Sequence, residues 1–508
     1  MAGQVQVKVV GAAAENVPRT AGRYAKEIAM AFTVWRGPGK PLADHLRLRN
    51  VDYLAACLLI VLPWSSTATS IFGAAMVIGL LVTADPVGLL NSVRRPAGAM
   101  PIVLILLVAA GTLWATDVPW LERLSAVEKM SKLALLPFLL VHFQGSPRAR
   151  MLMAAFISSN VVLLAYSFIV ATFPTLSMVV RLNQSGVPVR NYIDQTQGFT
   201  FCAVILAGGA IEAWMSNRSK DAVAIGALSG LFLLNLIFVS LARTAFIYGP
   251  LMIAILMARY CTGRAALLGM LVLPVAMVGL WQISPNIQTK VRTTFAELNV
   301  RSDAPVGEQQ PSAAVRLEFW RKSVGFVESA PILGHGTGSI RRLFENAAVG
   351  KTGIEALAVS NPHSQTLAAA IQWGILGVLI VWMMWIAHLG LFLSNTSFAA
   401  WVGMLATAQN IASSVFNSHL VDSYELWLYV LAVGIAGGAM MSRRHAVRPS
   451  EGAAEGASNT AGLTRRTWGR AGHLGGDNRG NVHTISPAKD SLDPTQGSGC
   501  GCDADRND

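Results

Sequence analysis

The sequence predicts an all-α polytopic membrane protein, and its composition and its apolar pattern both support this fold class. Of the 508 residues, 53% are hydrophobic and only 13% are charged, whereas about 25% are charged in an ordinary soluble domain. Apolar segments of about 17 to 25 residues recur along the chain, the length that a helix needs to cross a hydrocarbon core about 30 Å thick. Lipid is therefore expected to be the main solvent.

We expect about twelve transmembrane helices from these segments. Their predicted starts lie near Asp52, Ile71, Met100, Val127, Leu152, Phe199, Ala222, Thr244, Ala266, Ile375, Phe398 and Tyr424. The seventh and eighth segments are separated only by a short turn that ends at Arg243. We treat them as two helices because an arginine in the middle of a membrane is energetically costly.

The basic residues predict the orientation of these helices. The net charge is +12, and lysines and arginines cluster at the ends of apolar segments, which favours anionic lipid over nucleic acid as their partner. With twelve helices, these clusters fall on one side, and the positive-inside rule makes that side cytoplasmic. They are Arg36, Lys40, Arg47, Arg49, Arg94, Arg95, Arg148, Arg150, Arg218, Lys220, Arg259, Arg264, Arg443 and Arg444. Both termini are therefore predicted to be cytoplasmic.

The helices divide the chain into five parts. Residues 1–49 form a cytoplasmic tail, 50–283 contain helices one to nine, 284–364 form a large outer loop, 365–443 contain helices ten to twelve, and 444–508 form a second cytoplasmic tail. The second tail has few large apolar residues and is expected to be disordered. A second outer loop runs from about 173 to 197.

The large outer loop contains one predicted amphipathic helix, from Ser312 to Ala330, which Pro331 ends. Its apolar side chains form two adjacent stripes, Val315, Phe319 and Phe326 on one and Leu317, Trp320, Val324 and Val327 on the other. Such a helix should lie against the membrane interface or cap the helical bundle.

Three features of the outer side are candidates for chemistry. Arg243 lies in a very short turn where lipid ends, and such a residue usually faces a cavity and has a partner, although snorkelling to the headgroups is an alternative. His363 follows Pro362 at the start of a new apolar helix and can accept a proton near neutral pH, although a lone histidine is more often structural. Successive glycines at Gly334, Gly336 and Gly338 could bring backbone N–H groups to an anion, or could simply form a turn.

No metal or cofactor is expected from the sequence. The outer acidic residues, Asp422 among them, show no Asp-x-Asp pair and no cluster with histidine. An anionic leaving group would have to be stabilised by arginine, whose planar fork pairs bidentately with phosphate oxygens.

Five segments in a fixed order resemble a known family. They are Leu241-Ala-Arg243-Thr-Ala, Arg316-Leu-Glu-Phe-Trp320-Arg321, Ser329-Ala-Pro331-Ile-Leu-Gly334-His-Gly336-Thr-Gly338, Asn361-Pro-His363-Ser-Gln-Thr-Leu367 and Gly374-Ile-Leu-Gly377. Together with the number of helices and the large outer loop, this order is similar to that of the O-antigen ligase and polymerase superfamily.

The resemblance implies a bacterial inner-membrane glycosyltransferase whose site faces the periplasm and which uses no metal or cofactor. A ligase of this kind moves a glycan from undecaprenyl pyrophosphate to a lipid A-core hydroxyl in lipopolysaccharide biosynthesis. A polymerase adds it to another glycan, and a protein O-oligosaccharyltransferase adds it to a protein Ser or Thr. A lipid-linked glycan flippase or transporter is the alternative of another class.

The resemblance also assigns roles to residues. His363 would be the general base, and Arg243 and Arg190 would hold the pyrophosphate and stabilise its growing charge. Five further residues are expected to contact the substrate: Arg316, Arg181, Arg321, Gly336 and Gly338. Arg190 is preferred to Arg181 because it stands closer to the sixth predicted helix.

Overall fold

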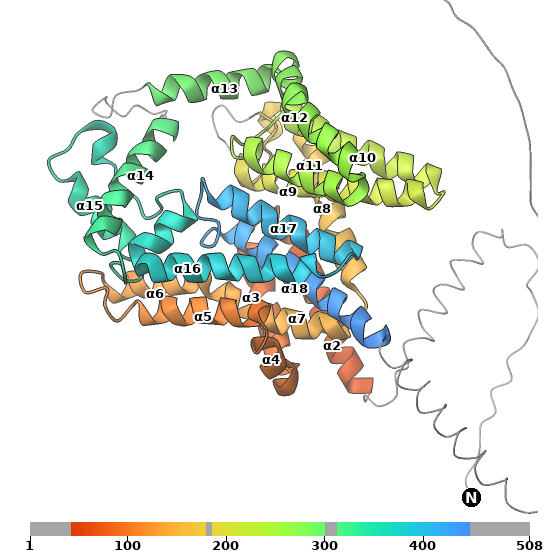
Figure 1. Cartoon of the computed structure of the whole chain (residues 1–508), viewed down its shortest axis with the longest axis horizontal. Helices are drawn as coiled ribbons and strands as arrows, with labels where there is room; N and C mark the ends of the chain where they lie inside the picture. The colour runs from red at the N-terminus through yellow and green to blue at the C-terminus, as the bar shows by residue number, and fades with distance from the viewer. Residues whose placement is uncertain (1–41, 179–184, 300–311, 448–508) are drawn as a thin grey trace, which may run out of the picture. The chain divides into compact units, whose positions relative to one another are not determined.

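The computed structural model describes residues 42–178, 185–299 and 312–447. No strand occurs in these ranges, and helices account for most of them (Figure 1). The helices are α2 (Leu42–Val61), α3 (Ser66–Val82), α4 (Pro86–Val93), α5 (Pro96–Ala110), α6 (Trp120–Met130), η1 (Ser131–Leu135), α7 (Leu136–Gly145), α8 (Ala149–Thr172), η2 (Pro174–Leu176), α9 (Tyr192–Met215), α10 (Ser219–Phe238), α11 (Ala245–Tyr260), α12 (Gly263–Ile283), α13 (Pro285–Leu298), α14 (Ser312–Ser329), α15 (Ile340–Ala348), η3 (Gly353–Ala356), α16 (Gln365–Leu393), α17 (Phe398–Ser414) and α18 (Ser423–Val447).

Within the described ranges, six helices are long and apolar enough to cross a membrane, namely α8, α9, α10, α12, α16 and α18. A seventh crossing would join α3 to α4, between which the chain bends by 106°. The helices α5 and α11 are apolar but shorter. These lengths establish a polytopic all-helical membrane protein, whereas the count of twelve stays a prediction.

Two local predictions of helix boundaries are decided by the structure. The seventh and eighth predicted segments are separate helices, since α10 ends at Phe238 and α11 begins at Ala245. The fourth predicted segment was expected to be one helix from about Val127. This prediction is wrong in detail, because the 3-10 turn η1 divides the segment and only α7 continues after it. Pro137 lies in the first turn of α7, where a proline fits because no N–H is needed there.

The helix α9 begins earlier than predicted. Asn191 caps it by accepting hydrogen bonds from the N–H groups of Ile193 and Asp194. The outer loop before α9 therefore ends at about residue 191 instead of 197. This start places Arg190 directly before the helix.

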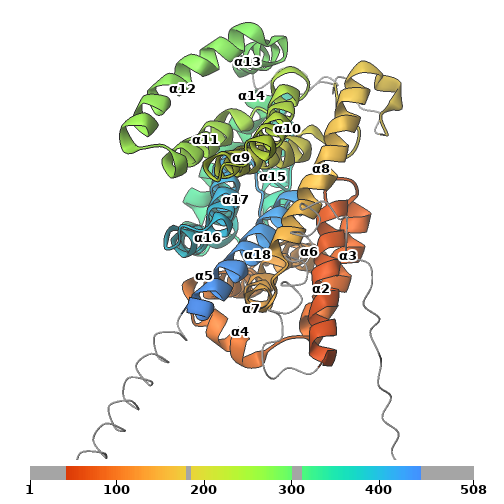
Figure 2. The same ribbon diagram turned by 90° about the vertical axis from the view of Figure 1, so that its right-hand side faces the viewer.

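The interior of the bundle is built around α18, which packs against α7, α8, α9 and α17. In the most apolar stretch of α18, between Ser423 and Ser442, 83% of the residues are buried, against 6% in the corresponding stretch of α12. Figure 2 shows α12 and α13 at the edge of the helices, away from α18. The core therefore lies along α18, and α12 contributes little to it.

The predicted amphipathic helix is confirmed as α14. Val315 and Phe319 are buried in a small cluster with Ile340 and Phe344 of α15, as expected for the first apolar stripe. In the second stripe, Leu317 and Val324 are exposed. The helix packs against α13, α15 and α16, which places it over one end of the bundle (Figure 1).

A break inside α16 fixes the chain that follows α14. Gly374 has φ 60° and ψ −153°, a conformation that is nearly exclusive to glycine. The break exposes backbone groups of α16 to the preceding loop, so that His335 N–H donates to Ile371 O and Ile375 N–H donates to Pro331 O. The loop is thereby fastened to the membrane helix.

Candidate active site

A cavity of about 340 Å³ lies between α11, α13, α14 and the loop after α17. Two arginines, Arg243 and Arg316, lie among side chains that are mainly apolar. The cavity is lined by Arg243, Thr244, Phe246, Ile247, Val291, Thr294, Phe295, Leu298, Ala313, Arg316, Leu317, Trp320 and Phe416. It therefore combines fixed positive charge with an apolar wall.

Arg243 lies in the turn between α10 and α11 and has an acidic partner in the outer loop. Its Nη1 and Nη2 donate to the two carboxylate oxygens of Glu297 on α13, at 2.5 and 2.7 Å. Nη1 also donates to Ser312 Oγ at 2.8 Å. The hydrogen bond with Glu297 raises the pKa of Arg243. The pair therefore keeps the guanidinium positively charged and fixes its orientation.

Two further cations surround this pair. The Arg316 Nε is buried without a hydrogen-bond partner, and Lys290 Nζ lies 5.2 Å from the centre of the Tyr192 ring. Burial lowers the pKa of both groups, and the charge of Arg243 lowers each of them further. Within the described residues neither forms an ion pair. Around the carboxylate of Glu297, these three cations give a local excess of positive charge beside the cavity.

His363 lies behind the Trp320 wall of the cavity. Its Nδ1 donates to Asn417 Oδ1 at 2.8 Å, which leaves the Nε2 lone pair free to accept a proton. The ring stacks on Phe319 with the centroids 6.2 Å apart, and Trp320 Nε1 donates to the His363 carbonyl oxygen at 3.4 Å. Burial lowers the pKa of His363, and the charge of Arg316 adds to this effect. The imidazole is therefore neutral at pH 7.

The backbone of His363 is also constrained. Its φ is 55°, a left-handed conformation that is uncommon for residues other than glycine. The Asn361 side chain accepts the His363 N–H at 2.8 Å and stabilises this turn. Residues held in such conformations concentrate at functional sites.

Arg190 shares the left-handed conformation, with φ 53°, but it does not line the arginine cavity. Its Nε donates to Asp194 at 2.7 Å, and its guanidinium carbon lies 5.5 Å from the centre of the Tyr424 ring. One atom, Nη1, is buried without a hydrogen-bond partner. Arg181, the other predicted contact in this loop, lies outside the described residues.

The remaining predicted contacts lie elsewhere. Arg321 pairs with Glu318 through two hydrogen bonds of 2.9 Å, and its side chain is 67% exposed. The N–H groups of Gly336 and Gly338 donate to the backbone and side-chain oxygens of Gln372. Since protein acceptors already use these N–H groups, the glycine segment acts here as a turn fastened to α16, and we leave Gly336 and Gly338 out of the proposed site.

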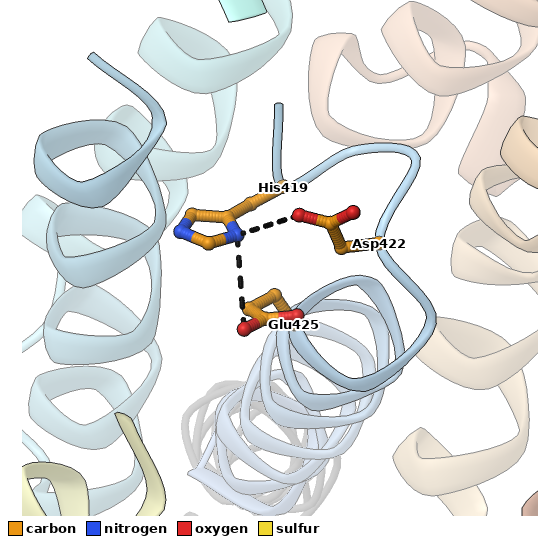
Figure 3. A group of neighbouring side chains, drawn as sticks. All are labelled: His419, Asp422 and Glu425. Atoms are coloured by element: carbon orange, nitrogen blue, oxygen red, sulfur yellow. Dashed lines mark ion pairs between the residues drawn. The ribbon is translucent and has the colours of Figure 1, made fainter. Parts of the chain in front are cut away.

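The structure also shows a cluster that the sequence analysis missed. His419 Nδ1 lies 3.3 Å from Asp422 Oδ2 and 3.8 Å from Glu425 Oε1 (Figure 3). The expectation that no histidine joins the outer carboxylates is therefore wrong at this point. The spacing His-x2-Asp-x2-Glu was visible in the sequence, but it spans a loop and the first turn of α18, so helical periodicity could not have shown that the three groups converge.

Three residues near the arginine cavity and His363 were also missed. Glu297 and Lys290 lie on α13, a helix that the sequence analysis did not predict in the outer loop. Asn417 follows an apolar helix and carries no motif. The amphipathic pattern of residues 285–298 was the one available signal for α13.

These features define a multi-pass membrane protein with a cationic, apolar-walled cavity beside a neutral histidine. Residues 228–382 match the family model described as O-antigen ligase, which supports a place in the O-antigen ligase superfamily. The matched range includes Arg243, Glu297, Arg316 and His363 but neither Arg190 nor Asn417. A comparison with curated protein sequences found no match.

Proposed function

We propose that this protein is an O-antigen ligase. It transfers a glycan from undecaprenyl pyrophosphate to a sugar hydroxyl of the lipid A core on the periplasmic face of the bacterial inner membrane. The observation that carries the proposal is the cavity in which Arg243 and Arg316 adjoin an apolar wall. A polyprenyl diphosphate has matching parts, a dianionic head and an apolar chain.

The proposed reaction begins at His363. The Nε2 lone pair takes the proton from the acceptor hydroxyl while the hydroxyl oxygen bonds to the anomeric carbon of the donor glycan. The bond between that carbon and the phosphate oxygen breaks, and its electron pair leaves with the pyrophosphate. A positioned general base typically contributes about 10²- to 10⁴-fold to the rate.

Arg243 and Arg316 bind the leaving pyrophosphate in this mechanism. Negative charge on the bridging oxygen grows as the glycosidic bond breaks, and fixed guanidinium groups stabilise it without reorganising. A charge-assisted hydrogen bond contributes roughly 1.5 to 3 kcal/mol. The unpartnered Nε of Arg316 has donor capacity left for an anion.

Arg190 is the third proposed anion contact. Its Nη1 has a free hydrogen-bonding position, while Asp194 and Tyr424 fix the rest of the guanidinium. Because it lies outside the arginine cavity, we assign it to the phosphate of the donor that is nearer to the glycan. Replacing Arg190 by Lys should therefore raise the KM for donor more than it lowers kcat.

The proposal is tested by incubating the purified protein with lipid-linked glycan and with lipid A-core acceptor, acceptor peptide or neither. A ligase glycosylates the core lipid. Growth of glycan on the carrier would indicate a polymerase, and labelling of the peptide would indicate a protein O-oligosaccharyltransferase.

A cellular assay gives a second test. The chain is expressed in a ligase-deficient strain, and lipopolysaccharide ladders are scored for the natural sequence and for His363→Ala. The natural sequence should restore ladders and the variant should not. Equal ladders from both, at equal protein level in the membrane, would remove His363 from the mechanism.

A further inference from the structure

We propose that His419, Asp422 and Glu425 bind a divalent transition-metal ion, such as Zn²⁺ or Mn²⁺. The site lies in the loop after α17 and in the first turn of α18 (Figure 3). It involves none of the groups assigned to the transfer reaction. The inference is therefore independent of the proposed function.

The three ligand atoms have the separation that a bound ion requires. They all lie within 4.8 Å of one another, and the His419 nitrogen is 3.3 and 3.8 Å from the two carboxylate oxygens. Ligands about 2.0 to 2.2 Å from a tetrahedral ion are themselves about 3.3 to 3.6 Å apart. The cluster is thus close to a coordination shell before any adjustment of side chains.

The His419 side chain is the second observation that points to a ligand. It is fully buried, and its Nδ1 has no hydrogen-bond partner although it faces both carboxylates (Figure 3). A buried polar atom without a partner costs about 1 to 3 kcal/mol. An ion held between the three side chains would give Nδ1 its missing partner.

The charge balance also favours a dication. In the described part of the chain, His419 is the one ion-pair partner of Asp422 and of Glu425. Glu425 is only 6% exposed, and the neighbouring Arg190 is committed to Asp194. Two carboxylates facing one imidazole are costly to ionise together in a poorly solvated place unless a cation compensates their charge.

The ring orientation needed for metal binding is provided by α9. Gln197 Nε2 lies 3.2 Å from His419 Nε2, so the amide fixes the imidazole. Binding at Nδ1 requires the ring proton on Nε2 and the amide oxygen of Gln197 turned toward it, a rotation that leaves the amide in place. A partner of this kind typically tunes metal affinity by 10- to 100-fold.

The ligand set determines the class of ion. One imidazole and two carboxylates suit Zn²⁺ or Mn²⁺ better than Ca²⁺ or Mg²⁺, which favour oxygen-only shells. Asp422 is 35% exposed and gives an ion access to the site. The bound ion would fasten the loop that carries Asn417 to α18 and so steady the partner of His363.

The experiment uses the full chain, purified without a histidine tag and treated with chelator. Isothermal titration with ZnCl₂ and with MnCl₂ measures stoichiometry, and Co²⁺ absorption in the visible range reports the ligand set. We expect about one ion per chain and a rise in Tm. Gln197→Ala should weaken binding by about 10- to 100-fold, and Asp422→Asn and Glu425→Gln, which remove direct ligands, should weaken it more.

Glu318→Gln is the matched control, since Glu318 is a buried carboxylate that pairs with Arg321 away from the cluster. Its metal affinity should equal that of the natural sequence. If the natural sequence binds neither ion, shows no Co²⁺ band, or binds as weakly as Asp422→Asn, the cluster is an ion pair alone and the proposal is overturned. The Co²⁺ measurement needs no variant, so a misfolded variant cannot hide that outcome.

Discussion

Arg243 and Glu297 form a two-pronged ion pair that joins the turn before α11 to the outer-loop helix α13. The carboxylate occupies both guanidinium nitrogens that a diphosphate would use in the same geometry. Donor binding must then displace Glu297 or share Arg243 with it. The same pair lowers the pKa of Glu297, because the hydrogen bonds from Arg243 and Ala313 outweigh the effect of its burial.

Replacing Glu297 by Gln should lower the KM for the lipid-linked donor. The amide keeps the shape but removes the competing charge, and a partly exposed ion pair is worth about 0.2 to 1 kcal/mol, or about 1.5- to 5-fold in affinity. Initial rates against donor content in mixed micelles measure this. Glu345→Gln, which breaks an exposed pair with Arg341, is the control. A higher KM would mean that Glu297 positions Arg243 instead of competing for it.

Replacing Arg243 by Lys should reduce kcat/KM by about 10- to 100-fold. Lysine keeps the charge but loses the fork, which removes at least one hydrogen bond of roughly 1.5 to 3 kcal/mol. Arg341→Lys on α15, where the arginine is 61% exposed, should stay near the natural rate. Equal rates for both variants would show that Arg243 only interacts with the headgroups.

The activity should fall on the acid side with an apparent pKa below 6.5. His363 must be neutral to accept a proton, and burial, aided by Arg316, lowers its pKa. The rate therefore rises with pH through this lowered value and is constant above it. In Arg316→Gln the pKa of His363 increases, so the acid limb should move to higher pH. If the acid limb of the pH profile does not move in Arg316→Gln, the charge of Arg316 does not affect the pKa of His363.

Asn417 is expected to position His363 for the reaction. Asn417→Ala removes the acceptor of the Nδ1 proton and should lower kcat by about tenfold with little change in KM. Asn417→Asp places a carboxylate beside the ring and should raise the pKa of His363, so the acid limb moves to higher pH. A purely structural role would change stability in both variants and leave the pH profile unaltered.

The break in α16 predicts a pair of opposite effects on stability. A Cβ at Gly374 would overlap the Ile332 carbonyl oxygen. An alanine held in the positive-φ backbone conformation of Gly374 would also cost about 1 to 3 kcal/mol of stability. Gly374→Ala should lower the Tm in detergent. Gly390 lies in the same helix with nothing near its Cβ position, so Gly390→Ala should raise stability by about 0.5 to 1 kcal/mol. Equal shifts in both would contradict the close approach at Gly374.

The sequence predicted the helices well wherever one physical cost dominated. The long apolar segments predicted the membrane helices. The cost of burying Arg243 in a membrane predicted the break between α10 and α11, and the amphipathic pattern predicted α14. The breaks inside apolar segments were missed. Gly374 and the 3-10 turn η1 depend on what packs beside them, and hydropathy does not contain that information.

The candidate site was predictable in its residue types but not in its pairings. Motif order selected Arg243, Arg316 and His363, of which the structure brings the two arginines into one cavity. Their partners Glu297 and Asn417 are 54 residues away from Arg243 and His363, respectively. Such pairs form only when distant segments pack together. The residue pattern of one sequence does not show which side chains will meet in this way.

The poor burial of α12 has a consequence for how substrate arrives. Its neighbours in the chain, α11 and α13, supply apolar walls of the arginine cavity through Phe246, Ile247, Val291 and Phe295, while α12 itself is largely exposed. Under the proposed function, the carrier can enter sideways by diffusing within the leaflet. The enzyme would then respond to the mole fraction of carrier among the lipids, and added inert phospholipid would slow it at constant total carrier.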